Sequence, residues 1–223
     1  MKGTMRIVLV MLLFCIQNLS AQTDALKPEQ VFGIYFNTFV KQDERALQQL
    51  NDYLAPFLGT ENTYTIDLNK SFNDEIQVLT GNFLANLPKE TAAACQAEAG
   101  EYFSALLNNV KNTGYVVKST KEVKNEYAAN SWVTELSVDL SFPVPANVST
   151  LKLEEARKMN AEDLKSYLKN KTKAFAKSEK KSTVHQIFKL YQVKKEGNTY
   201  YWNGGPQELV WKLNNSYFKS LNH

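Results

Sequence analysis

Cysteine and histidine are scarce in this 223-residue sequence, which contains two of each. Cys15 falls in an N-terminal segment that we expect to be removed, so Cys95 would have no partner for an intramolecular disulfide. Cys95 lies in an alanine-rich stretch typical of a helix, where a cysteine usually acts as a small buried apolar residue. His223 is the last residue and His185 lies far from it, so no histidine-based metal site is expected. The sequence therefore predicts no metal ion and no other cofactor.

The sequence also has no large excess of positive or negative charge. The chain has 26 basic and 23 acidic residues, and loss of Lys2 and Arg6 with the N-terminal segment leaves a formal charge near +1. This balance argues against a nucleic-acid-binding protein that works by general electrostatic attraction. A hydrophobic content of 43% over this length is enough for one domain with a sizeable core.

The first 21 residues resemble a secretory signal peptide. Two basic residues precede an apolar run from Ile7 to Ile16, and Leu19-Ser20-Ala21 offers small residues for cleavage. Ten apolar residues are too short to cross a bilayer of about 30 Å as a helix, so a permanent N-terminal anchor is the less favoured alternative. A lipid-modified Cys15 is rejected, because the residues before it are not small.

We therefore expect 1–21 to be a signal peptide and 22–223 to be a single exported domain, either periplasmic or secreted. No later run has transmembrane length, so the mature chain is expected to be soluble.

Apolar residues at spacings of three and four predict the first helices. They cover 28–58, as one long helix or a helix pair, then 72–87 and 89–112. Asp43, inside the first range, has polar neighbours on both sides, which favours a helix-capping role over a buried catalytic base.

The pattern then changes to alternation, which predicts strands. The ranges 115–127 and 132–142 form a predicted antiparallel hairpin, ended by Pro143 and Pro145. A lysine-rich helical insertion at about 146–181 separates it from strands at 183–194 and 199–202 and from a C-terminal helix after Gly204. The predicted fold is α+β, with N-terminal helices packed on one face of a curved antiparallel sheet. The second hairpin turns at Glu196-Gly197-Asn198, and 183–194 is expected to be a central strand.

Two segments resemble the NTF2-like (cystatin-like) superfamily. In 31–50 an aromatic-rich helix runs into a turn containing Asp43 and then a leucine-rich segment, and in 191–202 a charged glycine turn precedes an aromatic strand. The resemblance implies a cone-shaped fold with a pocket between sheet and helices. It does not imply an activity, because such folds carry both enzymes and binding modules. The chain departs from the family in its length and in the insertion at 145–181.

In that implied pocket the candidate ligand-binding residues are Tyr35, Phe39, His185, Tyr191 and Trp202. No catalytic residue is assigned. His185 has no carboxylate partner that the sequence identifies, as a general base would require. Glu135 and Asp139 share one side of a strand but lie about 13 Å apart, too far to act as an acid and base on one bond.

Three functions remain open at this point. The favoured one is a non-enzymatic exported binding module for a small ligand or a cell-envelope partner. The second is a pocket enzyme, isomerase- or hydrolase-like, that uses a buried carboxylate such as Asp43. The third is a structural or interaction protein without an open pocket. The lysine-rich helix at 164–181 is expected to be a solvated face rather than a site for anionic lipid or glycan.

Overall fold

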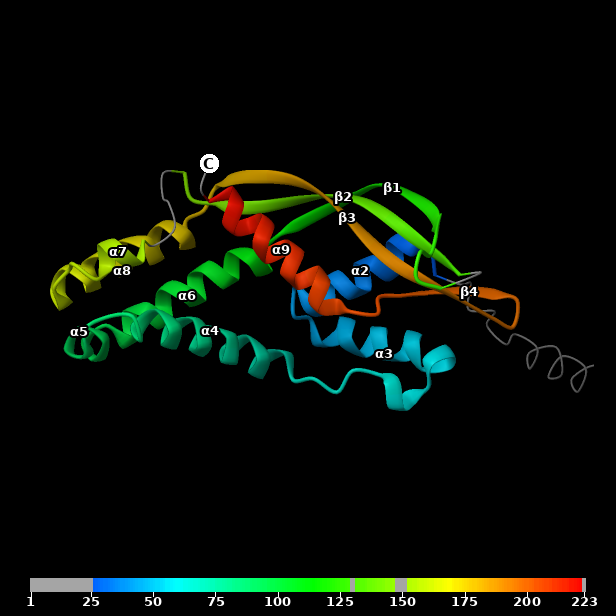
Figure 1. Ribbon diagram of the computed structural model, residues 1–223, viewed down its shortest axis with the longest axis horizontal. Coiled ribbons are helices and arrows are strands. Elements are labelled where there is room, and N and C mark those ends of the chain that lie inside the picture. The colour runs from blue at the N-terminus through cyan, green and yellow to red at the C-terminus, as the bar shows by residue number, and fades with distance from the viewer. Residues whose placement is uncertain (1–25, 129–130, 147–151, 222–223) are drawn as a thin grey trace, which may run out of the picture.

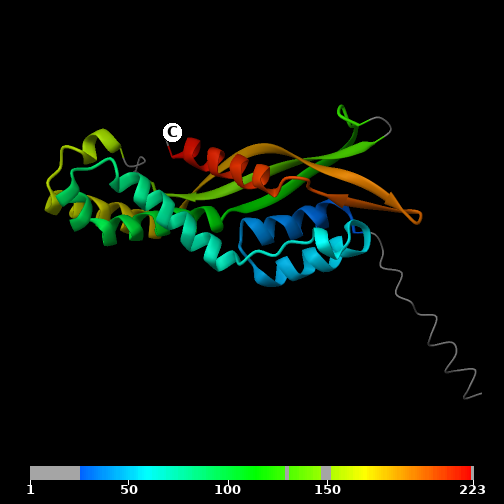
Figure 2. The same ribbon diagram turned by 60° about the horizontal axis from the view of Figure 1, so that its bottom comes forward.

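The computed structural model describes residues 26–128, 131–146 and 152–221, in which a four-stranded antiparallel sheet is covered on one face by helices (Figures 1 and 2). The predicted signal peptide, 1–21, lies outside the described residues. The helices are α2 (Pro28–Phe39), α3 (Glu44–Leu58), η1 (Thr60–Asn62), α4 (Leu68–Leu84), α5 (Lys89–Ala94), α6 (Gln96–Lys111), α7 (Leu153–Ala156), α8 (Ala161–Ala176) and α9 (Pro206–Ser220). The strands are β1 (Gly114–Lys124), β2 (Trp132–Val144), β3 (Lys180–Lys195) and β4 (Asn198–Trp202), adjacent in that order. The predicted α+β class is confirmed.

The sheet has two different faces because side chains alternate along each strand. On the inner face, which α2 and α9 cover, β2 presents a buried row from Leu136 through Val138 and Leu140 to Phe142. On the outer face β2 presents Glu135, Ser137, Asp139 and Ser141, which face away from the helices. The sheet therefore has one side in the core and one side toward solvent.

The prediction that Pro143 and Pro145 end the second strand is wrong for Pro143, which pairs with Lys181 of β3. Strand β2 continues to Val144 and ends directly before Pro145. Strand β1 pairs with β2 only as far as Ser141. Beyond that residue none of the described strands lies beside β2 on the β1 side, so a proline without an N–H group removes no hydrogen bond to β1 there.

The predicted helical region 28–58 is a helix pair. Asp43 separates the two helices, and its Oδ1 accepts hydrogen bonds from the backbone N–H groups of Arg45 at 2.8 Å and Ala46 at 3.3 Å. These bonds satisfy N–H groups that have no partner inside the helix. The capping role predicted for Asp43 is confirmed.

Aromatic rings fill the space between α2 and the sheet. The Phe32 ring lies 5.2 Å from those of Tyr115 and Phe188, and the Phe36 ring lies 4.5 Å from that of Tyr115, measured between centroids. Phe32, Phe36 and Phe188 are each at most 3% exposed. The place where the family resemblance implies a pocket is thus part of the packed core.

The insertion between β2 and β3 forms an extension beyond one end of the sheet, where α8 packs along α6 (Figure 1). Leu164, Leu168 and Phe175 of α8 are fully buried, and the buried Asn109 of α6 donates to the Phe175 carbonyl at 2.9 Å. Helix α8 ends at Ala176 and β3 already begins at Lys180, so the helical part of the insertion is shorter than predicted.

Side chains of helices α3 and α9 contact the free sheet edge on the β4 side. The Tyr53 hydroxyl donates to the Tyr201 carbonyl at 3.0 Å and accepts from the Tyr201 N–H at 2.8 Å, which pairs the outer edge of β4. On β3, Lys212 of α9 donates to the Ile187 carbonyl at 3.0 Å. Unpaired strand edges invite association with other chains, and these side chains occupy two positions along this edge. None of the described helices is both long and apolar enough to cross a membrane.

Candidate binding groove on helix α9

The five predicted ligand-binding residues lie in two places on opposite sides of the sheet. Tyr35 and Phe39 are stacked neighbours on α2, with ring centroids 6.2 Å apart. Tyr191 and Trp202 are paired across β3 and β4 on the outer face, with centroids 5.9 Å apart. His185 lies on the same outer face, six residues before Tyr191 along β3. No single site contains all five.

His185 has partners that only the strand register reveals. It is directly opposite Asp139 in the β2–β3 ladder, and its Nδ1 lies 3.0 Å from Asp139 Oδ1. Its Nε2 lies 3.4 Å from the Ser137 hydroxyl, and the Lys118 ammonium lies 3.8 Å from Asp139 Oδ2. On the outer face, His185 therefore contacts the side chains of both Ser137 and Asp139.

This cluster lacks the surroundings that nucleophilic catalysis requires. The His185 side chain is 55% exposed and that of Asp139 is 33% exposed, so water competes for every contact. None of the cavities described below is lined by these residues. A nucleophile also needs a site about 3 Å away where donors stabilise the reacting atom. We interpret the cluster as a cross-strand polar contact, which contributes about 0–1 kcal/mol at an exposed position.

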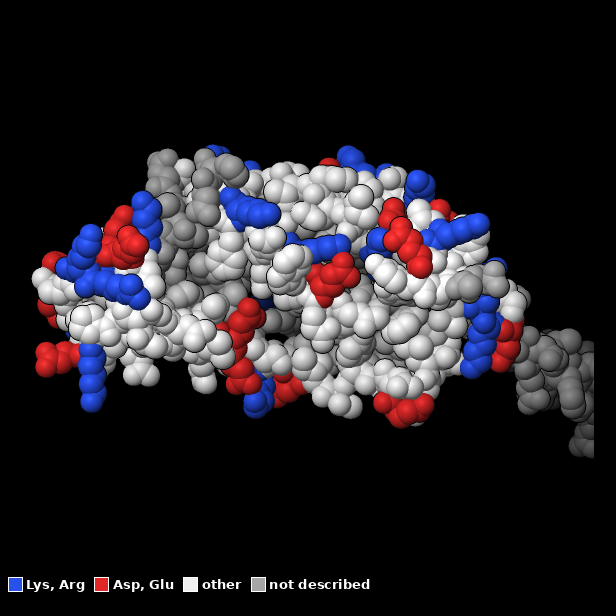
Figure 3. Space-filling view, in the orientation of Figure 1, with Lys and Arg blue, Asp and Glu red and all other residues white. Residues whose placement is uncertain are grey.

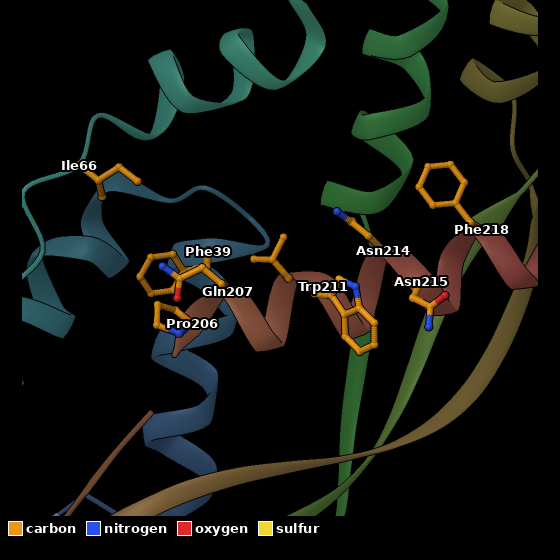
Figure 4. A pocket seen from close by; sticks show the side chains of 9 residues that line it. Phe39, Ile66, Pro206, Gln207, Trp211, Asn214, Asn215 and Phe218 are labelled. Atoms are coloured by element: carbon orange, nitrogen blue, oxygen red, sulfur yellow. The ribbon is translucent and has the colours of Figure 1, made fainter. Parts of the chain in front are cut away.

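A cavity lies on the side of α9 that faces away from the sheet. It has a volume of about 570 Å³ and is lined mostly by α9, with one residue from the end of α2 and one from the segment before α4 (Figure 4). We call this cavity the α9 groove; its lining consists of Phe39, Ile66, Pro206, Gln207, Val210, Trp211, Asn214, Asn215 and Phe218. Figure 3 shows a hollow in the middle of the same face, with acidic side chains on its lower rim.

The sequence of α9 explains why the groove forms. Leu209, Leu213 and Tyr217 recur at four-residue spacing and are at most 1% exposed against the sheet. A second stripe, Trp211 and Phe218, has the helical spacing of seven residues and lies on the other side. Helix α9 is therefore apolar on two sides, and only one of them faces the core.

Exposed apolar side chains gather at this groove. Trp211 is 64% exposed, Ile66 is 38% exposed and Phe218 is 36% exposed. Single exposed apolar residues are ordinary on protein surfaces, whereas several around one concave site indicate a place of binding.

The polar groups of the groove are neutral amides. Gln207, Asn214 and Asn215 are its hydrogen-bonding side chains, and none of the described residues that line it is charged. The Oδ1 atom of Asn214 is buried and accepts no hydrogen bond from any described residue. An unsatisfied buried acceptor costs about 1–3 kcal/mol.

A small recess of about 30 Å³ adjoins the groove and shares Phe39, Val210 and Asn214 with it. Its two charged lining residues are Glu75 of α4 and Lys111 of α6. Burial raises the pKa of the Glu75 carboxyl. The Lys111 ammonium lies over the ring of Phe72, 5.5 Å from its centroid.

Of the predicted residues, Phe39 alone lines the groove, and Tyr35 packs behind it. Tyr35 is 1% exposed, and burial raises the pKa of its hydroxyl. The remaining groove residues are not among the predicted ones, because the sequence pattern after Gly204 indicates a helix but does not show which of its sides stays uncovered. The signal that could have identified them is the excess of apolar residues on α9 over those that one buried side can hold.

The described residues contain no group of three or more histidine, cysteine, aspartate or glutamate side chains that could hold a metal ion. Cys95 is fully buried, and burial raises the pKa of its thiol, which disfavours the reactive thiolate. Comparison with protein-family models, with curated proteins and with solved structures finds no significant match.

Proposed function

We propose that this protein is a non-enzymatic binding module that holds a small, largely apolar ligand in the α9 groove. The observation that carries the proposal is an open cavity of about 570 Å³ lined by exposed apolar side chains and three neutral amides. Ligand sites usually measure about 300–1,000 Å³ and combine an apolar lining with a few polar groups that orient the ligand. The sequence-based expectation of a binding module is kept, while its location moves from the sheet–helix space to the outside of α9.

The test uses N-phenyl-1-naphthylamine, an uncharged probe that fluoresces in apolar surroundings. We expect saturable binding of this probe to the full chain, with one site per molecule. Trp211→Ala should weaken binding at least about fivefold, because it removes an exposed ring that would lose about 1 kcal/mol or more of contact.

Trp132→Ala is the matched control, since Trp132 is 39% exposed at the start of β2 and does not line the groove. Its affinity for the probe should stay within about twofold of the native chain. Absence of saturable binding, or equal losses in both variants, would reject the groove as the binding site.

A further inference from the structure

The recess beside the α9 groove differs from the groove in its chemistry. The groove offers apolar surface and neutral amides, whereas the recess adds the Glu75 carboxylate and the Lys111 ammonium. Phe39, Val210 and Asn214 belong to both linings, so a molecule in the groove could extend a terminal group into the recess.

The two charges of the recess are not equally satisfied. Lys111 lies in the last turn of α6, where the helix dipole favours a cation, and its ammonium also lies over the Phe72 ring. Glu75 lies in the middle of α4, and within the described part of the chain its carboxylate forms no ion pair or hydrogen bond. Among the described residues, Lys111 therefore has favourable surroundings, whereas the Glu75 carboxylate has no hydrogen-bond donor.

A second acceptor stands where the groove meets the recess. The side-chain oxygen of Asn214 is buried and without a hydrogen-bond donor among the described residues. A group with several N–H donors and a positive charge would pair with Glu75, and its remaining donors would reach Asn214 once that amide turns toward the groove, since an ammonium has three donors.

Resting on the proposed function, we infer that the ligand of the α9 groove is a small amphipathic amine, with its apolar body along Trp211 and Phe218 and its ammonium directed toward Glu75. Charge complementarity with a half-buried, unpaired carboxylate selects the cationic end group over a neutral or anionic one. The Glu75 carboxylate would strengthen the binding only of molecules that are long enough to reach the recess from the groove.

The test compares three molecules that share an eight-carbon chain and differ in the end group: octylamine, octanol and octanoate. Each competes with N-phenyl-1-naphthylamine for the full chain at about pH 8, which lies well above the ordinary pKa of a carboxyl group and below that of an alkylamine. We expect octylamine to displace the probe at concentrations at least about tenfold below octanol, with octanoate the weakest competitor.

Glu75→Gln should reduce the advantage of octylamine over octanol to less than about threefold and leave octanol unchanged. Glu101→Gln is the matched control, because Glu101 lies exposed on α6 and lines neither the groove nor the recess. It should preserve the full advantage. Lys111→Met, which removes the competing positive charge, should enlarge it.

The outcomes separate the two proposals. If the probe binds saturably but octylamine and octanol compete equally, or Glu75→Gln leaves the preference intact, the amine is the wrong ligand class and the groove stays a binding site. If neither the probe nor any of the three molecules binds, the groove itself is rejected and the amine with it.

Discussion

The hydrogen bonds of Tyr53 offer a direct test of how the sheet edge is held. The hydroxyl both donates to the Tyr201 carbonyl at 3.0 Å and accepts from the Tyr201 N–H at 2.8 Å. Burial raises the pKa of Tyr53 to about 12, which agrees with a hydroxyl removed from bulk water. Tyr53→Phe keeps the ring, which packs 5.5 Å from Phe57, and deletes both bonds.

The expected cost follows from the two lost bonds. Each contributes about 0.5–1.5 kcal/mol, so Tyr53→Phe should lower the free energy of unfolding by about 2 kcal/mol. For a chain of this size that corresponds to a fall in Tm of about 4–8 °C. The measurement is thermal and urea unfolding of the full chain, followed by circular dichroism.

Tyr127→Phe is the matched control, because Tyr127 is 90% exposed. It should change the free energy of unfolding by less than about 0.5 kcal/mol. If the two variants unfold at the same temperature, the hydroxyl of Tyr53 does not secure the β4 edge and the reasoning is refuted.

Three further predictions concern single groups. Asp43→Ala should lower the free energy of unfolding by about 1 kcal/mol, because two N–H groups lose their cap; an unchanged urea midpoint would contradict this. In a Cys15→Ser chain, the Cys95 thiol should react with Ellman's reagent only after unfolding, and rapid reaction of the folded protein would show that it is not buried. Stability should fall as the pH rises above about 10, because tyrosines of the unfolded chain ionise there while burial raises the pKa of Tyr53 and Tyr217 in the fold. Because burial raises the pKa of Tyr53 and Tyr217 in the folded protein, their contribution to stability is complete below about pH 10 and is lost as the pH rises toward those raised pKa values. A free energy of unfolding that stays constant up to about pH 11 would contradict the burial of these two tyrosines.

The parts of the fold that the sequence predicted are those governed by local pattern. The alternation of apolar and polar residues predicted β2. The turn at Glu196-Gly197, where both residues have positive φ, joins β3 to β4 as expected. Asp43 was identified as a cap from its polar neighbours alone. The predicted signal peptide, 1–21, lies outside the described residues and stays a prediction.

The parts that were not predicted depend on contacts between distant segments. Asp139 and His185 are 46 residues apart, with the insertion between them, so their register cannot be read from either strand. The contact between Tyr53 and Tyr201 spans 148 residues. The α9 groove was missed for a different reason: periodicity shows which helix sides are apolar, but only the packing of α9 shows which of them stays uncovered.

Binding of an amine in the α9 groove is best tested by a map of amide chemical shifts in the full chain on addition of octylamine. We expect saturable changes at the groove and recess, centred on α9 between Gln207 and Phe218 and reaching Phe39 and Glu75. Changes centred instead on the outer face around Tyr191 and Trp202, or no saturable change, would contradict it.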